Sequence, residues 1–168
     1  MRLQDLYGKR VGILRLEDYA PTVNSTGWQE MTTNQYWVVK DWNRISNDIE
    51  GCTISGTGNE QFSLPPGKYW FRGSTCWHTD AANATGGMAL KNVTADEYID
   101  GIQGNQTSSH TTNSGGQIFF GVFEITTQSV FQFQFSGTAA IYYCGVRFQE
   151  TGVTAEEIFC SVTIMKVG

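Results

Sequence analysis

Two histidines, His78 and His110, are the side chains best suited to proton transfer near neutral pH. Ser109 precedes His110, but adjacent side chains on an extended chain point to opposite sides, so they do not make a nucleophile and base. His78 and Asp80 supply two potential ligands, whereas a closed zinc site needs four. We therefore predict no catalytic residue, no metal site and no cofactor.

The main acidic cluster consists of Asp96, Glu97 and Asp100. It lacks the regular Asp-x-Asp-x-Asp-Gly spacing of a calcium loop, so we interpret it as a solvated edge. A pair of carboxylates that hydrolyses a glycosidic bond remains an alternative, but no two acidic residues stand apart from the others. We do not expect an enzyme.

The four cysteines contain no Cys-x-x-Cys pair, which argues against a zinc knuckle. They are Cys52, Cys76, Cys144 and Cys160. Each lies among apolar or small residues in a segment that we expect to be a strand. We predict reduced, buried thiols that act as small hydrophobic groups, with disulfides as the alternative.

Composition excludes several classes of function. A chain of 168 residues corresponds to about one domain. The net charge of −5 and the scattered basic residues argue against a nucleic-acid partner. No apolar run approaches the roughly 20 residues that cross a membrane, and the charged first residues do not resemble a signal peptide. The 13% aromatic and 16% charged content fits either a subunit of an assembly or an aromatic-rich core.

Residues 117–167 read as four successive strands separated by short polar or glycine-bearing breaks. The clearest signal is the alternation of Phe131, Phe133 and Phe135 with Gln132 and Gln134, which predicts one buried and one wet face. Strands at about ten-residue spacing are typical of an antiparallel sandwich or barrel.

Earlier segments extend this pattern. We expect strands at residues 35–45 and 68–77, with Gly73 marking a bulge or a close backbone approach. Residues 104–116 are too polar to fold on their own apolar contacts. Residues 1–32 mix both charges and contain Pro21, so we predict an extended N-terminal arm before a body of residues 33–168. Residues 11–16 of this arm could form a short strand, and the arm could pack on the sheet, on a neighbouring subunit or on a different protein. The predicted fold class is an all-β, antiparallel two-sheet jelly-roll sandwich.

Several short motifs occur in a familiar order from Trp37 to the C-terminus. They are the WVVKDWNRI segment, the LPPGKY segment that starts a long strand, the GVFEITTQSVFQFQ pair and the final EEIFCSVTIMKV strand. This order resembles tailed-phage virion domains that look like trimeric jelly rolls of the tumour-necrosis-factor type. In that group the GVFEITTQSVFQFQ pair forms a hairpin, and the N-terminal region attaches the domain to the virion. Met165 departs from the pattern, which usually has an aromatic residue there.

The resemblance implies a homotrimeric virion protein, assembled in the bacterial cytoplasm, that decorates or cements the phage head. Its partner would be the major capsid protein or another virion protein, with neither nucleic acid nor membrane. The alternative is a distal knob of a tail or head fibre that binds a host glycan. The expected capsid contacts are Arg2, Leu6, Tyr7, Arg10, Ile13, Leu14 and Arg15. The expected trimer contacts are Trp70, Phe119, Tyr142 and Phe159.

Overall fold

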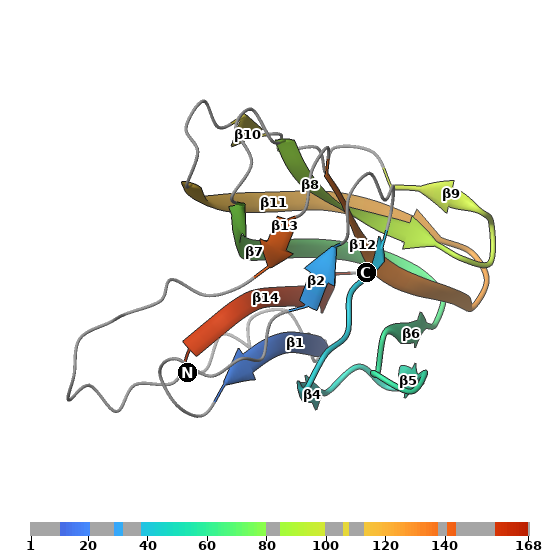
Figure 1. Cartoon of the computed structure of the whole chain (residues 1–168). Coiled ribbons are helices and arrows are strands. Elements are labelled where there is room, and N and C mark those ends of the chain that lie inside the picture. The colour runs from blue at the N-terminus through green and yellow to red at the C-terminus, as the bar shows by residue number, and fades with distance from the viewer. Residues whose placement is uncertain are drawn as a thin grey trace, which may run out of the picture.

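A computed structural model of the chain describes residues 11–20, 29–31, 38–79, 85–99, 106–107, 113–137, 141–143 and 157–167. These residues form strands and turns, and no helix occurs among them (Figure 1). All strand pairs are antiparallel and fall into two seven-stranded sheets. The expected all-β antiparallel sandwich is therefore confirmed.

Sheet A contains the longest strands, and four of them run side by side in Figure 1 in the order β11, β7, β14 and β1. Its members are β1 (Ile13–Ala20), β2 (Gln29–Met31), β4 (Arg44–Asn47), β7 (Gly67–Thr79), β11 (Asn113–Ile125), β13 (Ile141–Tyr143) and β14 (Glu157–Lys166).

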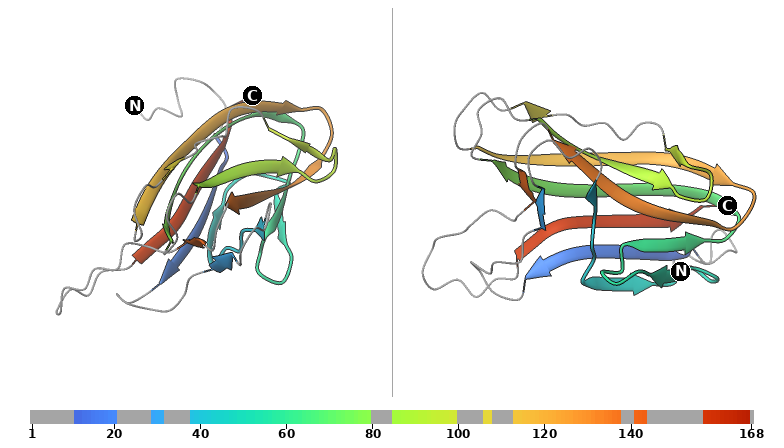
Figure 2. Two further views of the ribbon diagram at one scale, coloured as in Figure 1. Left: turned by 45° about the horizontal axis from the view of Figure 1, so that its top comes forward. Right: turned by 45° about the vertical axis from the view of Figure 1, so that its right-hand side comes forward.

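Sheet B faces it across the core, and Figure 2 shows the two layers from two further directions. Its members are β3 (Val38–Val39), β5 (Thr53–Ser55), β6 (Gln61–Leu64), β8 (Thr85–Asn92), β9 (Glu97–Tyr98), β10 (Gln106–Thr107) and β12 (Ser129–Gly137).

Phe133 lies at the centre of the core that joins the two sheets. Its ring centroid is 5.7 Å from that of Phe119 and 5.8 Å from that of Trp42. Phe62 lies at 5.9 Å and Phe71 at 6.5 Å. Offset and edge-on aromatic contacts of this kind add to the free energy gained by burying the rings. The phenylalanines of the alternating β12 segment therefore occupy the buried face that the sequence predicts.

The opposite face of β12 is not wet, which corrects the expectation for the two glutamines. Gln132 is 8% exposed and Gln134 is 5% exposed. Gln61 Nε2 donates to Gln132 Oε1 at 3.3 Å, and the Tyr98 hydroxyl donates to Gln134 Oε1 at 2.8 Å. Neighbouring side chains of sheet B cover the two amides and satisfy them, so polarity in the sequence did not mean exposure.

Short connections among the described residues carry the chain from one sheet to the other, and two of them correct the predicted elements. Residues 40–43 separate β3 of sheet B from β4 of sheet A, so residues 35–45 do not form one strand. Residues 126–128 separate β11 from β12, which lie in different sheets and do not form the expected hairpin. Residues 65–66 likewise connect β6 to β7.

Gly73 confirms a close approach, although the neighbour is a ring rather than backbone. Its pairing with β11 and β14 is regular, without a bulge. A Cβ at this position would lie 2.2 Å from Phe119 Cζ. The missing side chain therefore makes room for the Phe119 ring inside the core.

The N-terminal segment corrects the expected arm. β1 pairs with β14 along its whole length and with β4 on its other side. Leu14 and Leu16 are 0% exposed. Residues 13–20 are thus part of the sandwich, because their apolar side chains fill its core. Residues 29–31 also pair within sheet A. Residues 1–10 and 21–28 lie outside the described residues.

Candidate subunit interface

Strand β11 carries three large apolar side chains on the outward face of sheet A. Ile118 is 61% exposed, Phe120 62% and Val122 67%. We name these three residues the β11 stripe. They alternate with core residues, because successive side chains of a strand point to opposite faces. Among the described strands β11 pairs with β7 alone, so the stripe lies at an edge of the sheet.

The apolar surface continues from the stripe across the sheet. Val122 lies opposite Trp70 of β7, which lies opposite Met165 of β14. Met165 in turn lies opposite Ile13 of β1. Trp70, Met165 and Ile13 are all half-buried. One apolar row therefore crosses four strands that are far apart in the sequence.

A shallow groove of about 540 Å³ runs along this face beside the row. Its walls are Trp70, Arg72 and Ser74 of β7, Ile118 of β11, and Ser161 and Thr163 of β14. Small side chains on β14 and large ones on β11 produce a ridge next to a trough. This shape can receive side chains from another protein surface.

Charged pairs border the apolar part of the face. Lys68 Nζ lies 3.3 Å from Glu124 Oε2, and both side chains are more than half exposed. On the far side Arg44 Nη1 lies 3.3 Å from Glu17 Oε2, with the Arg44 guanidinium 3.5 Å from the Tyr19 ring centroid. An apolar centre inside a polar rim is the usual anatomy of a protein interface.

Exposure of the β11 stripe to water is unfavourable in free energy for an isolated subunit. Burial of a side chain such as Phe120 contributes about 1.5–3 kcal/mol relative to its exposure to water. An edge strand also offers unpaired backbone groups, and natural proteins normally protect long apolar edges against uncontrolled pairing. These features together identify the outward face of sheet A, along β11, as the candidate interface.

The four residues expected at a trimer interface lie in different environments. Trp70 lies in the apolar row of the outward face, and its contact with another subunit stays a prediction. The predicted interface contact of Phe119 is wrong, because this side chain is 2% exposed and fills the space beside Gly73 in the core. The side chains of Tyr142 and Phe159 lie outside the described part of the structure.

The residues expected to contact the capsid also lie in different environments. Ile13 and Arg15 lie on the outward face of sheet A, so their contact with the capsid stays a prediction. The predicted capsid contact of Leu14 is wrong, because this side chain is fully buried in the core. Arg2, Leu6, Tyr7 and Arg10 lie outside the described residues.

The β11 stripe was not among the predicted contacts, although the sequence carries a signal for it. The segment IFFGVFEI has apolar residues at both odd and even positions. A strand that is apolar on both faces is normally covered on both faces. This pattern in residues 118–125 could have predicted that both faces of the strand are covered.

Two residues of the acidic cluster are described, Asp96 in the turn before β9 and Glu97 in β9. Lys91 Nζ lies 2.7 Å from Asp96 Oδ1, and this hydrogen bond lowers the pKa of the Asp96 carboxyl and raises that of the Lys91 amine. Asp96 and Glu97 are exposed, as expected for a solvated edge. No group of three His, Cys, Asp or Glu side chains among the described residues is arranged to hold a metal ion. His110, Asp100 and the His78 side chain lie outside the described part.

Two of the cysteines are described, and Cys52 is a free thiol. Cys160 is buried and Cys52 is half-buried. Burial raises the pKa of Cys52 to about 11, and a hydrogen bond with Asn47 opposes the shift. The side chains of Cys76 and Cys144 lie outside the described residues.

Cys52 should therefore react slowly with iodoacetamide at pH 8, because the thiolate is the reactive form. Labelling of the native protein followed by peptide mapping should show modification at Cys52 that increases as the pH rises toward 11. Modification at pH 8 as fast as that of a free cysteine peptide would contradict the buried environment.

No helix among the residues described is long and apolar enough to cross a membrane. No model of a known protein family matches the chain, and neither does any curated protein.

Solved structures do match the fold. The crystal structure of murine APRIL at pH 8.0 superposes with a TM-score of 0.54 and 12% sequence identity, over 94% of this chain and 100% of that chain. A second structure of murine APRIL, at pH 8.5, gives a TM-score of 0.51 with the same identity and coverage. Both are jelly rolls of the tumour-necrosis-factor type, so the expected jelly-roll fold is confirmed.

Proposed function

We propose that the chain is a homotrimeric jelly-roll subunit of a tailed-phage particle and that it decorates the head. The observation that supports a trimer is the β11 stripe, because Ile118, Phe120 and Val122 are exposed on a sheet edge. The phage setting rests on the resemblance of the motifs from Trp37 to the C-terminus. The similarity in fold to jelly rolls of the tumour-necrosis-factor type supports the homotrimer.

A closed ring of three subunits suits the geometry of this face. The stripe lies on an edge strand, and the groove lies inward from it over β7 and β14. In a head-to-tail contact the edge of one copy enters the groove of the next copy, and such contacts close into a ring when the rotation permits. Three copies would then cover all three stripes without leaving an open edge.

Attachment to the particle is assigned to residues 1–10. They precede β1, and they include Arg2, Leu6, Tyr7 and Arg10 from the expected contacts. Three such segments on one trimer would bind neighbouring capsid subunits as one unit, which increases the affinity beyond that of a single segment.

Deletion of residues 2–10 should leave a soluble trimer that no longer binds phage heads lacking this protein. The deletion stops before Ile13, because removal of β1 would destroy sheet A. Binding can be measured by cosedimentation with the heads, with the full-length chain as control. Unchanged binding of the truncated trimer would refute the attachment role.

Cryo-electron microscopy of the particle separates decoration from the fibre-knob alternative. A copy at every capsid three-fold position supports decoration. A few copies at the end of a tail or head fibre would instead support a receptor-binding knob and overturn the proposed location.

A further inference from the structure

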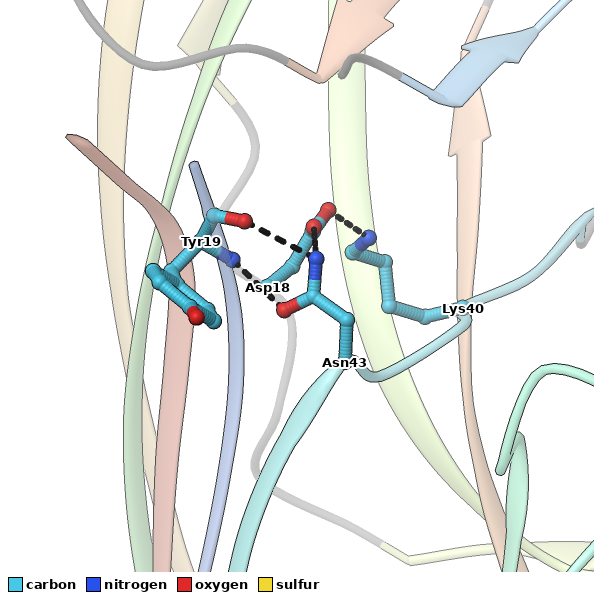
Figure 3. A network of polar contacts seen from close by, with 4 residues as sticks. All are labelled: Asp18, Tyr19, Lys40 and Asn43. Atoms are coloured by element: carbon cyan, nitrogen blue, oxygen red, sulfur yellow. Dashed lines mark hydrogen bonds and ion pairs between the residues drawn. The ribbon is translucent and has the colours of Figure 1, made fainter. Parts of the chain in front are cut away.

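A lysine and an aspartate face each other inside the sandwich. Asp18 of β1 follows the buried residues Leu14 and Leu16 on the inward face of sheet A. The Lys40 side chain is 1% exposed and that of Asp18 is 9% exposed. Lys40 Nζ contacts Asp18 Oδ2 directly (Figure 3). An ion pair in such a place is expensive to desolvate and is weak support for stability on its own.

The two residues belong to different layers. The Lys40 backbone N–H donates to the carbonyl oxygen of Phe133, on β12 of sheet B, at 2.8 Å. Asp18 lies opposite Cys160 in the pairing of β1 with β14 in sheet A. Any bond between the two side chains therefore joins the two sheets of the sandwich.

Asn43 holds the carboxyl group in place. Its Nδ2 donates to Asp18 Oδ1 at 3.3 Å and to the Tyr19 carbonyl oxygen at 2.9 Å, and its Oδ1 accepts from the Tyr19 N–H at 2.9 Å (Figure 3). Lys40 Nζ lies 5.7 Å from the Trp42 ring centroid. The amine and the carboxyl are thus fixed against each other in an enclosed, partly aromatic site.

From this geometry we propose that Lys40 and Asp18 condense into an intramolecular isopeptide bond once the chain has folded. The Lys40 ammonium transfers one proton to Asp18 Oδ2, and the neutral Nζ attacks Asp18 Cγ. The charge that develops on Oδ1 is stabilised by the Asn43 Nδ2–H donor. A second proton passes from Nζ to Oδ2, the Cγ–Oδ2 bond breaks, and one water molecule leaves. The Nζ–Cγ amide remains, with no oxidant or cofactor consumed.

Two physical effects drive the reaction. Well-oriented intramolecular reactions reach effective molarities of about 10⁵–10⁸ M, because the entropy of bringing the two groups together is already lost on folding, and this favours a condensation that is unfavourable for free amines and acids in water. The amide also replaces two buried charges with one neutral group that can still accept a hydrogen bond from Asn43. The product is a covalent link between the sheets that denaturants cannot reverse.

The test uses the purified full-length chain and needs no variant for its main result. Intact mass spectrometry in denaturant should give a mass lower than that of the sequence by one water molecule. Proteolysis and tandem mass spectrometry should recover a branched peptide that joins the segments around Asp18 and Lys40. A full-sequence mass without the branched peptide would overturn the proposal.

Two substitutions locate the bond. Lys40→Met removes the amine, so the variant should keep its full mass. Asp18→Asn leaves a carboxamide that can lose ammonia to give the same amide, so its linked product should have the same mass as linked wild type. A mass deficit that persists in Lys40→Met would assign the water loss elsewhere and overturn the proposal. None of these masses depends on trimer formation or on the site of attachment to a particle.

Discussion

A Phe120→Asp variant should sediment as a monomer at micromolar concentration, where we expect the wild-type chain to sediment as a trimer. Phe120 is 62% exposed in the single subunit and lies in the middle of the β11 stripe. Its loss removes about 1.5–3 kcal/mol of apolar burial at each interface. The new carboxylate adds a desolvation penalty of several kcal/mol, and both effects occur three times in a three-fold ring.

The matched control is Ala95→Asp, which adds the same charge at an exposed position in the turn between β8 and β9 of sheet B. This variant should remain a trimer, because Ala95 does not lie on the outward face of sheet A. Sedimentation velocity of both variants distinguishes the outcomes. A Phe120→Asp protein that remains trimeric would show that the stripe is not at the interface.

A Phe119→Ala variant should lose about 3–5 kcal/mol in the free energy of unfolding, although Phe119 is the direct neighbour of Phe120. The Phe119 ring is 2% exposed, lies 5.7 Å from the ring of Phe133 and fills the space that Gly73 leaves open. Its removal leaves a cavity in the core. Urea unfolding should be measured in the Phe120→Asp background, where unfolding is not coupled to dissociation.

Phe120→Ala in an otherwise wild-type chain allows removal of the side chain at position 120 to be compared with removal at position 119. It removes the same side chain from the opposite face of the same strand, so it should weaken the trimer. At concentrations low enough to dissociate the trimer, the free energy of unfolding of Phe120→Ala should differ from that of the wild-type monomer by less than about 0.5 kcal/mol. Equal losses of monomer stability at positions 119 and 120 would contradict the assigned faces of β11.

The contrast between Phe119 and Phe120 shows what the sequence could and could not predict. Strand propensity and alternation predicted the sandwich, since β7, β11, β12 and β14 fall close to the expected segments. Alternation does not say which of two apolar faces belongs to the core, and a shift of one residue exchanges the faces. The prediction chose Phe119 for the interface, whereas contacts with Gly73 and Phe133 place it inside.

Polar side chains were harder to place, because their environment depends on contacts that are distant in sequence. Gln134 looked exposed, but Tyr98 covers it and donates a hydrogen bond. Lys40 looked like part of a continuous strand, but the chain changes sheets there and turns the lysine toward Asp18. Neither arrangement follows from local periodicity, since both depend on how the two sheets come together.

The prediction of an N-terminal arm was wrong for a related reason. The mixed charges of residues 1–32 suggested an arm, yet Leu14 and Leu16 alternate with Ile13 and Arg15 as in any half-buried strand. That alternation is short, so it allowed a short strand at residues 11–16 but did not place this strand inside the sandwich. The fold therefore uses part of the segment that the sequence assigned to attachment, and only residues 1–10 retain that proposed role.

Assembly through the outward face of sheet A is the central claim, and the molecular mass of the purified wild-type chain in solution tests it most directly. Sedimentation equilibrium at micromolar concentration should give three times the chain mass of 18.7 kDa. A mass of one or two chains, unchanged as the concentration rises, would contradict a three-fold assembly.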